Sequence, residues 1–271
     1  MMKAKPYLIF TAIALAIGAC GHRAADHFNL GHGRLDKMDY EGAIQEFSKA
    51  IEINPHFGEA YLHRGYTKAQ MLNDTGAVAD FDRAVNYNAQ DEKIYYYRAF
   101  SKYRLNDCQG AKADYTIYIE KEPYDKTGFL GRGVAKAKCG DFGGAVGDFT
   151  RAIIIDTGFT DAYSQRGLAK NSQKDYAGAL ADFNHAIQQA PRLPELFCNR
   201  GVTKFDAQDF EGALADFDKA IALNTQFAQA YFGRGLTKLS LKQMEGGCAD
   251  LNKSAELGFK TAKQALANYC K

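Results

Sequence analysis

The sequence has no tryptophan, only 5 prolines among 271 residues, and a formal net charge of just +2. Even that small excess disappears without residues 1–19, because the remainder has 32 basic residues (34 − 2) against 32 acidic ones. A protein that binds nucleic acid without regard to sequence needs a basic surface, so we expect no nucleic acid among the partners. With 46% hydrophobic and 24% charged residues, the composition is that of a folded protein and excludes a disordered one.

Motifs for catalysis, metals and cofactors are also missing. The sequence has no HExxH and no CxxC, and the short motif Gly131-Arg132-Gly133 falls inside an expected helix rather than in a phosphate loop after a strand. His27 and His32 are five residues apart, roughly 140° around a helix, so they cannot share a metal on one face. We therefore expect no metal, no cofactor and no enzyme, although a Ser/His/acid triad assembled from distant residues stays open.

Only one apolar run is prominent, and it lies at the N-terminus. Tyr7–Ile17 follows a short basic start, and it is too short to cross a bilayer but has the length of a signal-peptide core. The next residues, Ile17-Gly18-Ala19-Cys20, resemble the bacterial lipobox. This resemblance implies a lipoprotein signal peptide over 1–19, which is removed, and a tether over 20–23 with lipid on Cys20. The alternative is an ordinary secretory signal with an incidental cysteine.

The lipobox also implies a compartment. Gly21 follows the cysteine where aspartate would retain a lipoprotein in the inner membrane. The resemblance therefore implies a protein anchored in the outer membrane of a Gram-negative cell and facing the periplasm, an oxidising space in which disulfides persist.

A period of 34 residues runs through the rest of the chain. Arginine, lysine, a small residue and an aromatic residue each recur at this spacing, and so does an acid. The arginine column is Arg64, Arg98, Arg132, Arg166, Arg200 and Arg234, and the lysine column is Lys68, Lys102, Lys136, Lys170, Lys204 and Lys238. The acid column is Glu46, Asp80, Asp114, Asp148, Asp182, Asp216 and Asp250.

Each period contains two helical faces. Tyr61 and Gly65 are spaced i, i+4, and Ala77, Phe81 and Ala84 are spaced i, i+4, i+7. The small residues Gly65 and Ala77 would let the two helices approach closely, with the ring of Phe81 filling the space beside them.

These columns resemble the tetratricopeptide repeat (TPR), a helix–turn–helix unit that stacks into a superhelix. The resemblance implies an all-α, right-handed α-solenoid of about seven TPR units over 24–261, closed by a capping helix over 262–271 with Leu266 and Tyr269 turned inward. The expected copies are 24–57, 58–91, 92–125, 126–159, 160–193, 194–227 and 228–261.

The arginine and acid columns predict a ladder of ion pairs, because arginine and carboxylates form bidentate pairs. Pairing within a copy (Arg64 with Asp80) and pairing across copies (Arg64 with Glu46) give the same number of bonds. We favour pairing across copies, since Leu30 stands in the arginine column of the first copy, where no acid precedes it. The alternative is an anion-binding stripe. For the lysines we expect stems packed along the helix junction rather than a polyanion site.

Six cysteines are present, and Cys20 is assigned to lipid. The others allow two disulfides, Cys248–Cys270 between the last copy and the cap and Cys108–Cys139 between the third and fourth copies, with Cys198 left as a buried thiol. The alternative is five ordinary small core residues.

In the TPR family the first helix of each pair lines a concave groove that binds partners. The groove expected here is apolar and aromatic, densest in the third copy, and some of its side chains must also pack between repeats. The side chains expected there are Leu62, Tyr66, Tyr96, Tyr97, Phe100, Tyr103, Arg104, Leu130, Val134, Leu168, Val202, Phe205, Phe232 and Leu236. The comparable positions do not hold the Lys, Asn and Arg set of the family's carboxylate clamp, so capture of a C-terminal carboxylate is not expected.

The sequence therefore predicts a membrane-tethered scaffold or adaptor that binds partner proteins or peptides through its groove. A periplasmic chaperone or carrier that holds an extended peptide or glycan is the main alternative. A lipoprotein enzyme is a third class, which no motif supports.

Overall fold

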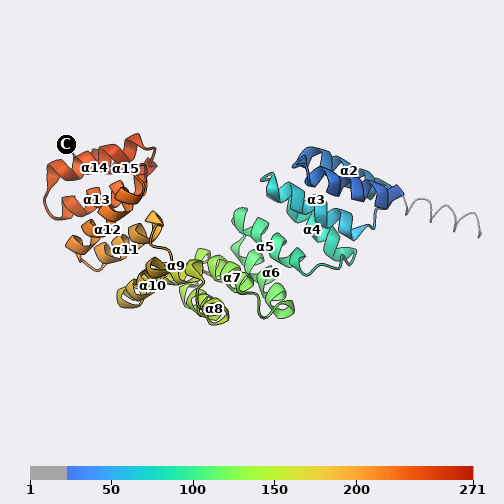
Figure 1. Ribbon diagram of the computed structural model, residues 1–271, viewed down its shortest axis with the longest axis horizontal. Helices are drawn as coiled ribbons and strands as arrows, with labels where there is room; N and C mark the ends of the chain where they lie inside the picture. The colour runs from blue at the N-terminus through green and yellow to red at the C-terminus, as the bar shows by residue number, and fades with distance from the viewer. Residues whose placement is uncertain (1–22, 271) are drawn as a thin grey trace, which may run out of the picture. The chain divides into compact units, whose positions relative to one another are not determined.

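The computed structural model describes residues 23–270, so the signal peptide and Cys20 fall outside the described residues. The chain forms two compact units, one ending at Pro123 and the other beginning at Tyr124. Within each unit, successive helices lie side by side in pairs (Figure 1). After a helix over 23–35, the first unit has α2 (Tyr40–Ile53), α3 (Gly58–Gln70), α4 (Asp74–Asn86), α5 (Lys93–Arg104) and α6 (Cys108–Lys121). The second unit has α7 (Lys126–Lys138), α8 (Phe142–Ile155), α9 (Thr160–Ser172), α10 (Tyr176–Gln189), α11 (Pro194–Asp206), α12 (Phe210–Leu223), α13 (Ala228–Ser240), α14 (Met244–Glu256) and α15 (Lys260–Tyr269).

This architecture confirms the expected all-α solenoid of paired helices. One helix pair lies in each expected copy, and α15 follows the last pair. Its first residue, Lys260, lies two residues before the expected start of the capping helix. In the described part of the chain, no helix is both long and apolar enough to cross a membrane.

The second helix of most copies begins at the same cap. The side chain of Asp39 accepts a hydrogen bond from the backbone N–H of Gly42, three residues later. A Cβ on Gly42 would lie 2.3 Å from Oδ2 of Asp39, so glycine lets the carboxylate close over the helix end. The same pairing caps the second helix of each of the next five copies, with Asn73 in place of aspartate in the second. These caps satisfy backbone donors that the first helical turn leaves free.

A buried ring fills the space between the two helices of a copy, as the sequence predicts. Phe81 is fully buried, and a Cβ on Gly65 would lie only 3.0 Å from its ring. Gly133 and Gly201 face Phe149 and Phe217 in the same way. The small residue on the first helix therefore sets how closely the ring can approach.

The predicted ion-pair ladder exists, but the pairing across copies that we favoured is wrong. Arg64 binds Asp80 of its own copy, with Nε 2.9 Å from Oδ2 and Nη2 2.7 Å from Oδ1. Glu46 instead accepts hydrogen bonds from His27 and Lys49, both in the first copy. The same bidentate pair joins the first and second helices in each of the remaining five copies.

The lysine column shares these acids. Lys68 Nζ lies 2.7 Å from Asp80 Oδ2, and the five equivalent lysines reach their own aspartates in the same way. Each buried aspartate thus has two cationic partners, and hydrogen bonding to Asp250 raises the pKa of Arg234. This arrangement accounts for both cation columns without an anion-binding stripe.

Neighbouring copies are still joined through the arginines, but at another position. Nη1 of Arg64 donates to Ser48 of the preceding copy, and Nη1 of Arg234 reaches Asp218 at 2.6 Å. These acceptors lie two residues after the acid column, and Asp218 is 60% exposed. The inner bonds hold a copy together, while the outer bond links it to the copy before.

Candidate partner-binding face

Several aromatic residues of the third copy pack on one another and on neighbouring rings. The ring of Tyr97 lies 5.0 Å from that of Tyr66 and 5.8 Å from that of Tyr96. Tyr96 in turn packs on Tyr115 and Tyr118 of α6, at 5.6 and 5.3 Å. Burial raises the pKa values of Tyr97 and Tyr115. Much of this cluster therefore packs within the first unit.

Arg104, one of the expected groove residues, already has partners. Arg104 Nε lies 3.0 Å from Asp74 Oδ2, and Nη1 donates to the carbonyl of Ala69 at 3.3 Å. The guanidinium also lies over the ring of Phe100, which is itself 44% exposed.

The other expected groove residues differ in burial. Leu62 is buried beside Phe81 and belongs to the core of the second copy. Leu130 and Val134 pack against the cluster around Phe149 and are half-buried. Tyr103 and Leu168 are half-buried as well, whereas Val202 is 41% exposed.

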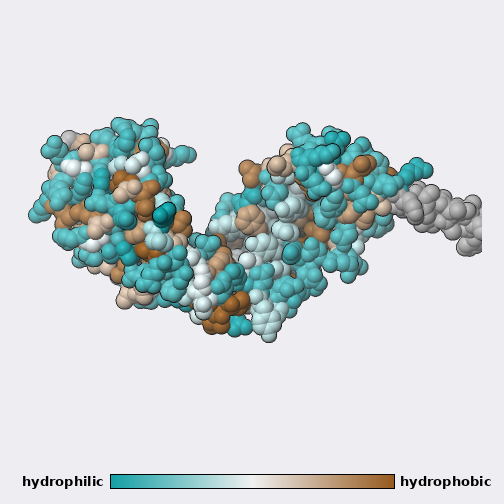
Figure 2. Space-filling model, viewed as in Figure 1, coloured by the Kyte–Doolittle hydropathy of each residue, from teal (hydrophilic) through white to brown (hydrophobic). Residues whose placement is uncertain are grey.

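Two adjoining apolar hollows lie in the second unit, over the sixth and seventh copies. The inner hollow, of about 220 Å³, is lined by Val202, Phe205, Asp206, Phe217, Phe232, Gly233 and Leu236. The terminal hollow, of about 390 Å³, is lined by Phe205, Leu236, Leu239, Ser240, Met244 and Tyr269. Phe205 and Leu236 border both, so the two hollows form one apolar face. On the side seen in Figure 2, hydrophobic residues of each unit gather in patches among hydrophilic ones.

A missing side chain opens the inner hollow. Gly233 lies on α13 next to the ring of Phe217. A Cβ at this position would lie 2.5 Å from that ring, so any larger residue would cover it. Phe232 is turned toward Phe259, with ring centroids 4.9 Å apart, and so lines the side of the hollow.

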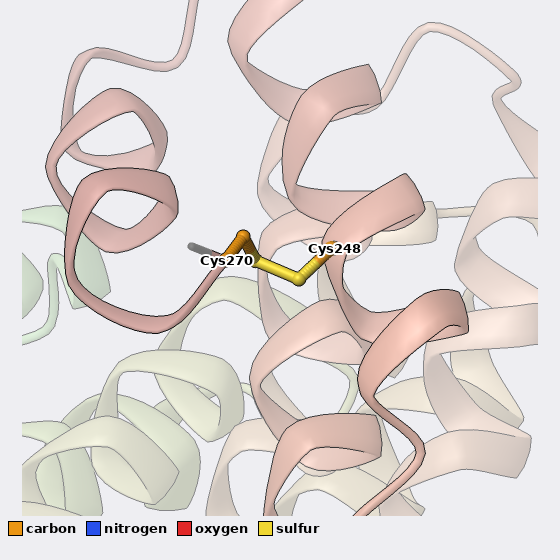
Figure 3. The surroundings of a disulfide bond; sticks show 2 residues. All are labelled: Cys248 and Cys270. Carbon is orange, nitrogen blue, oxygen red and sulfur yellow. A yellow bond between two sulfur atoms is a disulfide. The ribbon is translucent and has the colours of Figure 1, made fainter.

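The C-terminal disulfide places one wall of the terminal hollow. Cys248 on α14 and Cys270 after α15 are bonded, with Cα atoms 5.7 Å apart (Figure 3). This confirms the predicted bond. Tyr269, which we expected to turn inward, is 55% exposed, and it borders the hollow next to the bonded residue.

The remaining cysteines of the described residues are Cys198, Cys108 and Cys139. Cys198 is a free, buried thiol, as predicted, and burial raises its pKa to about 12. Cys108 lies in the first unit and Cys139 in the second, and their pairing stays a prediction. Within residues 23–270, no group of three or more His, Cys, Asp or Glu side chains could hold a metal ion.

Comparisons with known proteins agree with this architecture. Residues 198–256 match the model of a tetratricopeptide repeat family. A solved tetratricopeptide repeat protein from Parabacteroides merdae is 19% identical and has a TM-score of 0.77, with 92% of this chain and 100% of that chain covered. Residues 198–256 thus carry tetratricopeptide repeats, and the chain has the fold of a solved tetratricopeptide-repeat protein. No curated protein sequence matches the chain.

Two further solved structures resemble the chain. YrrB, described as a TPR protein with an unusual peptide-binding site, is 23% identical with a TM-score of 0.57, over 73% of this chain and 97% of that chain. PilW, described as a type IV pilus biogenesis factor, is 18% identical with a TM-score of 0.65, over 76% and 96%. At these identities the likeness shows the fold.

The structure brings together four of the expected groove residues, Val202, Phe205, Phe232 and Leu236, at the two hollows. Sequence reasoning missed Leu239, Met244 and Tyr269. Leu239 shares a repeat position with Tyr103 and Phe205, so the period could have found it. Met244 begins α14 in a column that holds Phe142, Tyr176 and Phe210 in earlier copies, so the period could have found it too, whereas Tyr269 belongs to the non-repeating cap.

Proposed function

We propose that this TPR protein is an interaction scaffold that binds an apolar segment of a partner protein on the face formed by the inner and terminal hollows. The observation that carries the proposal is the pair of adjoining apolar hollows bordered by Phe205 and Leu236. Together they offer space for two large side chains at neighbouring places, and apolar pockets of this kind supply much of the affinity at protein interfaces. The role requires no chemistry from the scaffold itself.

Photo-crosslinking in cells tests this placement. We expect adducts from a photoreactive amino acid at Val202 or Leu236, on the rim of the hollows, and none from the same group at Lys219, an exposed residue on α12. Phe205→Asp should remove the adducts, because a charge would then stand between the two hollows. Equal adducts at Lys219, or adducts that survive Phe205→Asp, would place the partner elsewhere.

We further propose that the scaffold is lipid-anchored through Cys20 in the outer membrane and faces the periplasm. The support is the basic start, the apolar core and the lipobox of the sequence. Cys20→Ser should yield soluble or unprocessed protein in a membrane fractionation. A cleaved variant that still partitions with membranes would refute the tether.

A further inference from the structure

We propose that the bound segment carries a lysine or arginine beside its apolar side chains, and that Asp206 and Asn171 receive this cation at the rim of the inner hollow. The proposal rests on the proposed function, since it concerns the same face and names the chemistry of its partner.

Asp206 is a carboxylate without a cation. It lines the inner hollow and ends α11, and its Oδ2 accepts a hydrogen bond from Nδ2 of Asn171 at 2.8 Å. None of the ion pairs found in the described part of the chain includes Asp206. By contrast, the buried acid of the same copy, Asp216, holds both Arg200 and Lys204. The two cations nearest in sequence on α11 are therefore already engaged.

Asn171 leaves a second acceptor at the same place. Its Oδ1 is shielded from solvent and accepts no hydrogen bond from the described residues. Such an atom is costly to bury unless a donor reaches it. A carboxylate and an amide oxygen that both lack a strong donor favour a donor-rich cation, and a lysine has three N–H donors and an arginine five.

The position of Asp206 in the repeat holds a different residue type in most other copies. The equivalent residues are Asp36, Gln70, Arg104, Lys138, Ser172 and Ser240. Asp206 and Asp36 of the first copy are the two acids of this column, and in the third copy the column has the opposite charge, with Arg104 neutralised by Asp74.

The remaining lining of both hollows is apolar apart from Ser240. One charge at one side of an apolar face fixes the direction in which a segment lies, because a reversed segment would leave Asp206 unpaired. The site therefore selects apolar segments with a flanking basic residue over apolar segments in general.

A matched peptide series tests the inference on the full chain. The probes are fluorescent peptides with two leucines at varied spacing and one flanking position occupied by Lys, Arg, Gln or Glu, measured by fluorescence anisotropy. We expect the Lys and Arg peptides to bind at least about tenfold more tightly than the Glu peptide, with a preference that weakens as salt is added.

Variants test whether Asp206 causes the preference for Lys and Arg peptides. Asp206→Asn should remove it and Asp206→Lys should reverse it, while Glu211→Gln, the loss of an exposed acid on α12, should leave it unchanged. If all peptides bind alike and Val202→Asp abolishes their binding, the cation site is refuted and the apolar face stands. If no peptide binds, both this inference and the proposed face fail.

Discussion

Tyr97 in the third copy and Gly233 in the seventh occupy the same position of the repeat, 136 residues or four periods apart. In the third copy the ring of Tyr97 packs on the rings of Tyr66 and Tyr96. In the seventh copy no side chain is present, and the ring of Phe217 becomes part of the wall of a hollow. The third copy is richer in aromatic residues, yet the last copies hold these two hollows.

This comparison shows that many large side chains on one face of a repeat do not by themselves make a site for a partner. Large neighbours at every position pack on one another, as in any close-packed interior. A hollow forms where a large side chain stands beside one that is small or missing, as Phe205 and Phe232 stand beside Gly233. The two regions also differ in how their charged side chains are paired. Arg104 forms an ion pair with Asp74, whereas Asp206 accepts a hydrogen bond from the amide of Asn171 and has no cationic partner among the described residues.

Removal of the buried acid of a copy should cause a large loss of stability, and the loss should be the same in the third copy as in the sixth. Asp114→Ala and Asp216→Ala each leave a half-buried arginine and lysine without their buried acid, and we expect each to lower the free energy of unfolding by about 2–3 kcal/mol, less than for a fully buried pair. The matched controls Asp82→Ala and Asp218→Ala remove exposed pairs and should cost about 0–1 kcal/mol. Thermal unfolding followed by circular dichroism measures both. A loss at only one of the two buried sites would show that the ladder is not uniform.

Removal of the terminal disulfide should affect the second unit alone. Cys248→Ser opens a loop with a sequence separation of 22 residues, which in the chain-entropy model is worth about 3 kcal/mol. We expect faster amide hydrogen exchange in α15 and weaker binding at the terminal hollow, because Tyr269 is no longer held there. Exchange in α5 and α6 should stay unchanged and serves as the internal control. Unchanged exchange in α15 would mean that packing on α14 alone fixes the cap.

One truncation in the third copy and one at the inner hollow should distinguish a residue that stabilises the fold from a residue that binds the partner. Tyr96→Ala removes a ring that packs on Tyr115 and Tyr118, and we expect a loss of about 2 kcal/mol in stability. Val202→Ala removes a side chain that is 41% exposed, and should cost less than about 0.5 kcal/mol while weakening partner capture. Melting temperature and crosslinking yield measure the two effects. The reverse pattern would place the partner on the third copy.

The smallest effect is a pH dependence confined to the first unit. Burial, followed by the neighbouring His32, lowers the pKa of His63 to about 4, and Asp91 acts in the opposite direction. His32 lies 4.3 Å from His63, with Phe28 and Phe47 packed around it. The unfolded chain takes up a proton near pH 6.5, so the contribution of His63 is complete above that pH and is lost as pH falls toward 4.

Because His63 is half-buried, solvent screening reduces this loss, and we expect less than about 1 kcal/mol at pH 5.5. His63→Gln should flatten the dependence between pH 7 and pH 5. An equal dependence in this variant would assign the titration to another group.

The period made most of the fold predictable. Gly65 and Phe81 are correctly paired from spacing alone, because helix geometry turns spacing into a shared face. The partner of the arginines was not predictable in this way, since Arg64 is 18 residues after Glu46 and 16 before Asp80. Only the packed helices show that Asp80 faces the first helix of its own copy.

The binding face was predictable in part. The column that contains Val202 and Leu236 follows from the period. The hollow in front of it depends on the size of the neighbouring side chains, which the period does not determine. Tyr269, which borders the terminal hollow, comes from the cap, where the period stops. Asn171 was missed because its role depends on contact with Asp206, 35 residues away.

The ion pairs within each copy have a consequence for how such an array grows. A 34-residue segment arrives with its own arginine, lysine and aspartate, so a gene duplication inserts a unit whose buried charges are already matched. Even the first copy, which has Leu30 in the arginine column, supplies His27 and Lys49 to its Glu46. A ladder that paired only between copies would leave an orphan acid or arginine at each end. Descendants of this chain can therefore gain or lose repeats without an electrostatic penalty at the junction.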